Sequence, residues 1–126
     1  MRDIQNRQDV SLMVITFYDR VQNDPTIGYL FNEVAKVDWD HHLPKMIDFW
    51  ESILFHTGAY SGNPMPAHQQ LHEKSALTAA HFDQWKKLFV ETVESLFEGE
   101  NATRAIHRAR SIATIMQIKV LHLNDQ

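Results

Sequence analysis

Apolar residues recur at intervals of three and four positions along most of this chain, which is the spacing of a buried helix face. No segment shows the alternation of apolar and polar residues that is typical of a half-buried strand. Turn-forming residues are scarce, because the chain has only four Gly and four Pro among its 126 residues. The sequence therefore predicts an all-α fold with four long helices and two short ones.

The first two long helices are expected on either side of a short one. The first apolar stripe begins near residue 8 and ends at Asp24, which would cap a short helix that has Pro25 in its first turn. The second stripe runs from about residue 38 to residue 56. Pro44 lies near its start, and a proline clashes with the carbonyl group four residues earlier in a helix. We therefore expect regular helix from about His41 onwards, or a kink there.

A turn-rich segment divides the second half of the chain. Residues 57–66 hold two of the four Gly and two of the four Pro, and a short helical stretch is expected around residues 67–74. The third long helix is expected to begin after Thr78 and to end at Gly99. Asn101 is expected to cap the fourth long helix.

The size and charge of the chain exclude several classes of protein. A length of 126 residues predicts a single domain, residues 1–126, that is large enough to bury a core. The formal net charge of −4 gives no basic surplus for binding nucleic acid or an acidic membrane surface. No apolar run approaches the roughly 20 residues that span a membrane, and the N-terminus lacks an apolar signal core. We therefore expect a cytoplasmic protein with no nucleic-acid or membrane partner.

Any metal would have to be held by imidazole and carboxylate groups, because the chain has eight His and no Cys. No Glu is followed by His three positions later, which argues against a carboxylate-bridged di-iron site. The His-Glu-x-x-His pattern of zinc proteases, the G-x-S-x-G turn of serine hydrolases and a glycine-rich phosphate loop are also missing. His68 and His72 are one helical turn apart and could face one metal, but such a pair arises easily by chance.

Haem is the remaining chemical option that the residue types support. A haem site needs one imidazole on one side of a flat apolar slot. The other side needs room for a small ligand and one or two hydrogen-bond donors. The chain supplies imidazoles, aromatic and aliphatic wall residues, and polar aromatic side chains within its apolar stripes.

Five short stretches carry a resemblance to a known family. They are TFYDRV at 16–21, LFN at 30–32, WDHHLPKMIDFW at 39–50, YSGNPMPAH at 60–68 and HFDQWKKLF at 81–89. In combination they resemble the truncated haemoglobins, and among these the third group, over about residues 10–120. The resemblance implies a shortened globin in which a two-over-two helical sandwich encloses haem b. It also implies that the first globin helix is largely missing and that the proximal helix is mostly a loop.

The resemblance assigns roles to individual residues. His68 matches the proximal histidine, which is the axial ligand of the haem iron, and His72 is a rival ligand one turn away. Tyr18, His42 and Trp85 match polar residues of the distal pocket, where a small ligand binds. The Trp85 indole N–H can only donate a hydrogen bond, which suits a ligand that gains negative charge. Without the resemblance, Tyr and Trp in an apolar stripe are more often core residues.

Further haem contacts are expected along the apolar stripes. Phe31 matches the aromatic residue that packs against the haem face in globins. His42 could donate to a ligand, gate the pocket or bind the iron, whereas the neighbouring His41 is expected to point to solvent. The candidates for the pocket wall, some of which fit an ordinary core nearly as well, are Met46, Phe49, Ile53, Leu71, Leu77, Phe82 and Met116. The candidates for partners of the haem propionates are Lys45, Arg104 and His72.

Three functions are compatible with these residues. The first is reversible binding of O₂, CO, NO or a similar diatomic ligand, with slow release that suits storage, sensing or redox detoxification better than bulk transport. The second is a haem enzyme for peroxide reduction or nitric oxide oxidation, which would require an electron-donating reductase. The third is a colourless, non-haem helical module that binds a metal or a partner.

Overall fold

The computed structural model describes residues 1–57 and 77–124, with side chains up to residue 119. Within these ranges every regular element is a helix, which confirms the all-α prediction. The elements in chain order are α1 (Arg7–Gln22), the short π-helix η1 (Leu30–Val34), α2 (Trp39–Phe55), α4 (Ala79–Leu96) and α5 (Glu100–Asn124). The short helix expected around residues 67–74 lies outside the described residues.

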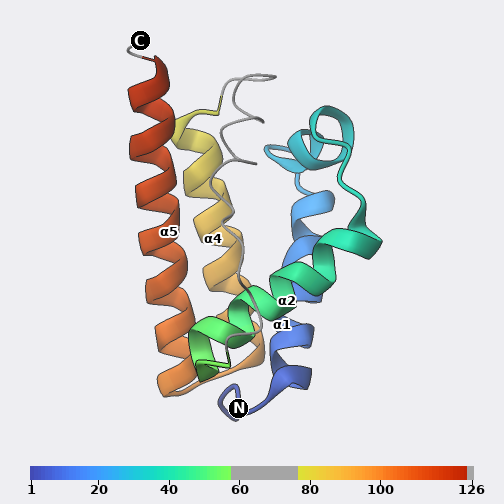
Figure 1. The fold of residues 1–126 in the computed structure, drawn as a ribbon, viewed down its shortest axis with the longest axis vertical. Helices are drawn as coiled ribbons and strands as arrows, with labels where there is room; N and C mark the ends of the chain where they lie inside the picture. Colours follow the sequence, from blue (N-terminus) through green and yellow to red (C-terminus); the bar gives the residue numbers. More distant parts are fainter. Residues whose placement is uncertain (58–76, 125–126) are drawn as a thin grey trace.

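Two pairs of long helices make up the fold (Figure 1). α4 and α5 run side by side, and α2 crosses α1. α1 also packs on α4, and α2 packs on α5, so that the two pairs lie against each other. This is the two-over-two helical arrangement expected from the sequence.

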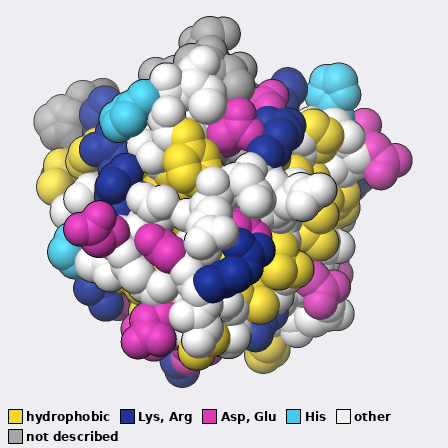
Figure 2. Space-filling view, turned by 90° about the horizontal axis from the view of Figure 1, so that it is seen from below, with side chains coloured by type: hydrophobic (Ala, Val, Ile, Leu, Met, Phe, Trp, Pro, Cys, Tyr) yellow, Lys and Arg dark blue, Asp and Glu magenta, His cyan; other side chains and the backbone are white. Residues whose placement is uncertain are grey.

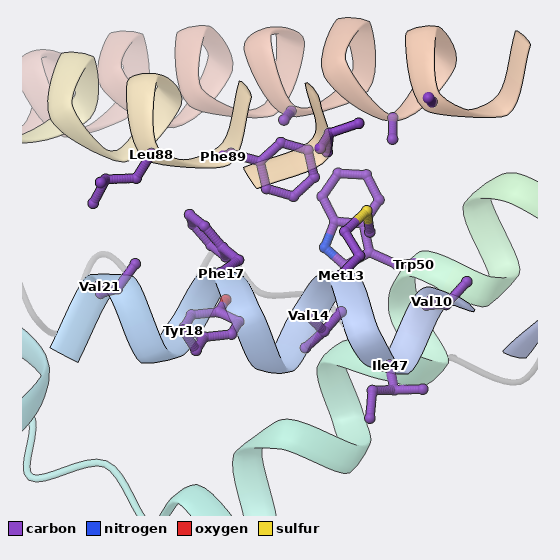
Figure 3. Packing of buried hydrophobic residues seen from close by; sticks show 14 of the residues in the cluster. Val10, Met13, Val14, Phe17, Tyr18, Val21, Ile47, Trp50, Leu88 and Phe89 are labelled. Carbon is purple, nitrogen blue, oxygen red and sulfur yellow. The ribbon is translucent and has the colours of Figure 1, made fainter. Parts of the chain in front are cut away.

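The core forms where α1 meets α2 and α4. The predicted apolar stripe of α1 is buried, and its members are Val10, Met13, Val14, Phe17, Tyr18 and Val21. Met13 and Phe17 point from α1 toward Trp50 and Phe89 (Figure 3). The Phe17 and Phe89 rings meet edge to face with centroids 5.1 Å apart, and Trp50 stacks on Phe89 at 4.8 Å. This aromatic packing fixes how α1, α2 and α4 lie relative to one another.

The helix α2 begins at Trp39, two residues before the start expected from the proline. Pro44 therefore lies inside the helix. The N–H groups of His41 and His42 both bond to the carbonyl oxygen of Asp38, at 3.1 and 2.8 Å. The first turn is thus closed upstream of Pro44, so the missing N–H of the proline does not prevent the helix from starting earlier.

Asp24 acts as a cap, as predicted, but it caps the turn at residues 25–27 and not a helix that has Pro25 in its first turn, because η1 begins only at Leu30. Its Oδ2 accepts hydrogen bonds from the backbone N–H groups of Thr26 and Ile27, at 2.9 and 3.0 Å. The chain then continues into η1, a rare helix type that occurs mostly in short pieces and often near functional sites. The apolar spacing predicts a short helix here, but it does not distinguish a π-helix from an α-helix.

The junction between α4 and α5 differs from the prediction. α4 ends at Leu96, three residues before Gly99, and Asn101 lies inside α5 and is not its cap. The carboxylate of Asp3 takes that role, because its oxygens accept from the N–H groups of Asn101 and Ala102, each at 2.9 Å. Gly99 has φ +142°, and a Cβ there would collide with the Asp3 side chain. The N-terminal segment therefore supplies the cap of the last helix.

The surface formed by the described residues is mixed in charge. On the face seen in Figure 2, acidic and basic side chains are interspersed, with hydrophobic side chains between them. Among the described helices, none combines the length and the apolar character that a membrane crossing would require.

Candidate functional site

Four aromatic side chains from three elements form one cluster, which we call the distal cluster. Tyr18 comes from α1, Phe31 from η1, and Trp39 and His42 from the first turns of α2. The Tyr18 ring centroid lies 5.3 Å from that of His42, 5.4 Å from Trp39 and 6.3 Å from Phe31. Phe31 stacks on Trp39 at 6.1 Å. The structure therefore brings together Tyr18, Phe31 and His42, which the sequence placed in the site.

The phenol of Tyr18 stays neutral to a more alkaline pH than an ordinary tyrosine does. Its side chain is buried, with 5% of its surface exposed. Burial raises the pKa of Tyr18 above its usual range, because the phenolate would lose its hydration. A neutral phenol keeps its O–H and can donate a hydrogen bond to a group beside the ring.

The two adjacent histidines at the start of α2 lie in different environments. His41 is exposed, as expected, whereas His42 is half-buried and its Nε2 atom is shielded from solvent. The His42 ring meets the rings of Tyr18 and Trp39 edge-on, with the Trp39 centroid 5.6 Å away. Of the two imidazoles, His42 is therefore the one that faces the distal cluster and could contact a ligand there.

Trp85 reaches the distal cluster through Phe17. Its ring meets Phe17 edge to face at 5.4 Å and stacks on Phe89 at 5.9 Å. Phe17 in turn lies 4.8 Å from Tyr18, its neighbour on α1. These ring contacts place Trp85 one ring away from Tyr18.

An apolar cavity lies beside Trp85, between η1, the start of α4 and α5. Nine side chains line it: Ile27, Leu30, Phe31, Leu77, His81, Phe82, Trp85, Ala113 and Met116. Five of these nine were predicted site residues, namely Phe31, Leu77, Phe82, Trp85 and Met116. We call this space the aromatic cavity.

A second apolar hollow lies between α2 and α5. Its lining residues are Phe49, Ile53, Arg108, Ser111, Ile112, Ile115 and Met116. The predicted wall residues Phe49 and Ile53 face this hollow and not the aromatic cavity. Met116 borders both spaces, so the two hollows adjoin at this side chain.

Several predicted residues are not placed in the site. His68, Leu71 and His72 lie outside the described residues. Met46 is half-buried against the core and lines neither hollow.

Of the two propionate candidates that the structure describes, neither lines the aromatic cavity or the hollow between α2 and α5. Lys45 is exposed on α2. Arg104 donates to the carbonyl oxygen of Leu54 at 3.0 Å. It lies twelve residues before Met116, which is about 18 Å along the axis of α5. Arg104 therefore sits away from the aromatic cavity.

Sequence reasoning missed some residues of the site. Trp39 belongs to the distal cluster, and its position one turn before His42 was a signal that could have assigned it. His81 and Ala113 line the aromatic cavity, one turn before Trp85 and three residues before Met116. Ile27 and Leu30 also line the aromatic cavity. Their position there depends on how the chain leading into η1 folds back, and the spacing of apolar residues does not predict that.

The residues present fit a flat, mostly apolar cofactor with a polar ligand pocket. Aromatic and aliphatic side chains line the aromatic cavity, and the adjoining distal cluster offers a neutral phenol and an imidazole. Within residues 1–57 and 77–119, no three His, Asp or Glu side chains gather in a way that could hold a metal ion. The walls of the aromatic cavity and the distal cluster are therefore compatible with haem.

Comparisons with known proteins agree with this arrangement. The model of the family described as bacterial-like globin matches residues 3–118. Over 115 residues the chain is 28% identical to the group 3 truncated haemoglobin ctb of Campylobacter jejuni, a match that covers 89% of this chain and 88% of that protein. The crystal structure of a group III truncated haemoglobin from Campylobacter jejuni matches with a TM-score of 0.81 and 27% identity, over 95% of each chain.

Proposed function

Because the chain belongs to the bacterial-like globin family, we propose that it binds haem b and, through it, small diatomic ligands such as O₂, CO and NO. The family match and the likeness to group III truncated haemoglobin confirm the resemblance predicted from the sequence motifs. Membership of a globin family implies haem. The proposal adds which residues of this chain hold the cofactor and what they do to a ligand.

The cofactor would be held by one histidine and by the apolar walls. His68 is the proposed axial ligand, on the strength of its place in the YSGNPMPAH motif. A neutral imidazole nitrogen would bind the iron, and its other nitrogen would donate to an acceptor that fixes the tautomer. Phe31, Phe82 and Trp85 would supply aromatic contacts from the lining of the aromatic cavity.

When bound, ferrous haem would supply a coordination position for a diatomic ligand. The chain's own contribution is to hold donors beside that position. Tyr18 is protonated at neutral pH, as an ordinary tyrosine is, and burial raises its pKa further, so its O–H can donate to a ligand that gains negative charge. The Trp85 indole can only donate, and His42 lies against Tyr18. Hydrogen bonds to charged groups contribute about 1.5–3 kcal/mol each.

Two such donors would slow ligand release by on the order of 10²-fold or more. Slow release favours storage, sensing or redox detoxification of the ligand over bulk transport. The observation that carries the proposal is the buried, neutral phenol of Tyr18 in contact with His42, next to the aromatic cavity. The cytoplasmic location expected from the sequence is part of the same proposal.

Ligand release from the haem-loaded protein tests the role of the donors. We expect the double variant Tyr18→Phe/Trp85→Leu to release O₂ on the order of 10²-fold faster than the wild type in stopped-flow measurements. Each single variant should give part of that increase. An O₂ release rate that is the same in the double variant and the wild type would refute the assignment of Tyr18 and Trp85 as donors.

His42 favours a second candidate function, an oxidoreductase on the same scaffold. Its ring lies 5.3 Å from that of Tyr18, inside the distal cluster, where it could pass protons to a substrate. Peroxide reduction takes up two protons and two electrons for each peroxide, and a separate reductase would supply the electrons. In turnover assays with a reductase and peroxide, His42→Leu should lose most of the rate while Tyr18→Phe/Trp85→Leu changes O₂ release. Absence of turnover in the wild type would leave ligand binding as the function.

A further inference from the structure

Two side-chain contacts join α4 to the segment before η1, and we call them together the clasp. Gln84 Nε2 donates to Asp24 Oδ1 at 2.8 Å, across 60 residues of sequence. One turn earlier on α4, His81 Nε2 lies 3.4 Å from Tyr29 Oη. Neither contact belongs to the backbone pairing of a helix, so both serve to hold the two elements against each other.

Asp24 uses its two carboxylate oxygens for different purposes. Oδ2 accepts from the N–H groups of Thr26 and Ile27 and so holds the turn in its own segment. Oδ1 accepts from Gln84 on α4. The carboxylate is therefore held both by its own turn and by α4. A movement of Gln84 on α4 would displace the carboxylate and, with it, the turn.

His81 is oriented by its own helix terminus. The N–H of Thr78 donates to His81 Nδ1 at 3.1 Å, within the capping box at the start of α4. Nδ1 is then an acceptor without a proton, so Nε2 carries the proton and donates toward the Tyr29 hydroxyl. The second contact of the clasp thus has a defined direction, from α4 to the segment before η1.

The clasp lies next to the residues that define the proposed ligand pocket. Trp85 directly follows Gln84, and Phe31 comes two residues after Tyr29. Both Trp85 and Phe31 line the aromatic cavity, together with His81 itself. A five-residue π-helix has little stability of its own, so its position depends on such tertiary contacts.

We infer that Gln84 and Asp24 are positioning residues for the ligand pocket: their hydrogen bond, supported by His81 and Tyr29, sets the separation of Phe31 and Trp85. The inference rests on the proposed function and extends it from the residues that face the ligand to those that hold them in place. A loosened clasp would let η1 and the start of α4 move apart. The indole N–H of Trp85 would then lose its alignment, and ligand would be released faster.

The test replaces the donor of this hydrogen bond by an acceptor. In Gln84→Glu, the new carboxylate faces that of Asp24, and the two acceptors repel each other. We expect O₂ release from the haem-loaded variant to rise about tenfold. This is the effect of losing one hydrogen bond to a charged group, here the bond from the Trp85 indole N–H to the ligand. The infrared C–O stretching frequency of the CO-loaded protein should shift as well. Amide hydrogen exchange in residues 26–31 and 79–85 should become faster, with or without haem.

The double variant Asp24→Asn/Gln84→Glu provides the rescue. The new amide at position 24 keeps an oxygen for the N–H groups of the turn, and its nitrogen can donate to the carboxylate at position 84. The pair is then restored with donor and acceptor exchanged and with the net charge of the wild type. Release rate, C–O frequency and exchange should therefore return to within about twofold of the wild type. Gln8→Glu, at an exposed position on α1, controls for the charge added in Gln84→Glu and should change none of the three.

Each outcome decides the inference. An unchanged release rate and C–O frequency in Gln84→Glu would overturn the positioning role, even if hydrogen exchange became faster. A double variant that behaves like Gln84→Glu would overturn the pairing, because restoring the hydrogen bond would then have no effect. If the wild type takes up no haem, the proposed function fails and this inference fails with it. If the wild type binds haem and the variants are unaltered, only the clasp is refuted.

Discussion

Tyr18 combines a ring that packs in the core with a hydroxyl in the proposed ligand site. Its ring packs against Phe17, Trp39 and His42, as an ordinary core residue would. Its hydroxyl belongs to a site that we propose for ligand binding. The substitution Tyr18→Phe separates the two, because it keeps the ring and removes only the oxygen.

The ionisation of Tyr18 predicts how stability responds to alkaline pH. Burial raises the pKa of Tyr18 in the folded protein, whereas the unfolded chain ionises near the ordinary tyrosine pKa of about 10. The unfolded state therefore loses this proton first as the pH rises, and the free energy of unfolding falls above about pH 10. Urea unfolding between pH 8 and pH 11 should show this loss in the wild type. Tyr18→Phe should show a smaller loss, and equal slopes in the two proteins would contradict the assignment.

His56 ends α2 in a left-handed conformation, with φ 55° and ψ 38°. A side chain with a Cβ is strained there, and Gly is the residue that adopts this conformation without cost. We expect His56→Gly to raise the free energy of unfolding by about 0.5–1 kcal/mol in urea titrations. His41→Gly, at an exposed position inside the same helix, should lower it by about 0.3–0.5 kcal/mol, because His has a higher helix propensity than Gly. A His56→Gly variant that is less stable than the wild type would show that the imidazole contributes more than the strain costs.

At the scale of helices and turns, the cap of α5 shows how distant parts of the chain complete an element. Asp3 accepts from the first-turn N–H groups of α5, and Asn101 Nδ2 donates to the carbonyl oxygen of Ile4 at 2.7 Å. The Glu98 N–H also bonds to the carbonyl oxygen of Arg2, at 3.0 Å. Residues 2–4 therefore hold the junction between α4 and α5 in place, although they belong to neither helix.

The loss of this cap should be measurable. We expect Asp3→Ala to lower the free energy of unfolding by about 1–2 kcal/mol at neutral pH. Burial alone would raise the pKa of Asp3, but three backbone N–H donors and the charge of Arg104 hold it below its ordinary value of 3.8. The carboxylate thus stabilises the fold fully above that ordinary pKa, and this contribution is lost as the pH falls through the lowered pKa.

Asp3→Asn is the matched control for this element, because Asn caps a helix but does not ionise. It should keep most of the wild-type stability at neutral pH and should lack the part of the acid dependence that comes from Asp3. If Asp3→Ala and the wild type unfold at the same urea concentration, the cap contributes nothing to the stability of the fold.

The sequence predicts helices well where the signal is local. The apolar stripe of α1 and the start of α4 after Thr78 depend on residues a few positions apart, and the structure has both as predicted. The Asp3 cap could not be predicted, because 98 residues separate it from Asn101. The π form of η1 likewise depends on contacts with the rest of the fold.

The site was predictable only in part, for a related reason. Tyr18, His42 and Trp85 were chosen because they match family motifs, not because helical spacing distinguishes them from core residues. Their convergence depends on how α1, α2 and α4 cross, and periodicity does not encode that crossing. This is also why Phe49 and Ile53 were grouped with Phe82, although they line a separate hollow that shares only Met116 with the aromatic cavity.

At the scale of the whole molecule, one run of aromatic contacts joins the core to the distal cluster. It leads from Trp50 through Phe89 to Phe17, and from Phe17 to Tyr18. Packing that sets the arrangement of the helices therefore also sets where Tyr18 lies. Stability and ligand binding should be coupled through this run.

Phe89 tests that coupling, because its side chain is fully buried where α4 packs against α1 and α2. Phe89→Ala should lower the free energy of unfolding by about 3–5 kcal/mol, since it leaves a cavity that the neighbouring rings cannot fill. Phe89→Leu, which keeps more of the volume, should cost less. A haem-loaded Phe89→Leu protein with faster O₂ release would support the coupling, and one with wild-type release would show that the site is independent of this contact.

The central claim is that the chain holds haem through His68, and an absorption spectrum tests it most directly. The purified protein would be measured in the ferric form, after reduction, and after addition of CO, beside His68→Ala and His72→Ala. We predict a strong Soret band that shifts with CO in the wild type and in His72→Ala, and a band that is altered or lost in His68→Ala. A normal spectrum in His68→Ala would show that another histidine is the iron ligand. The absence of a Soret band in the wild type after addition of haem would contradict the account as a whole.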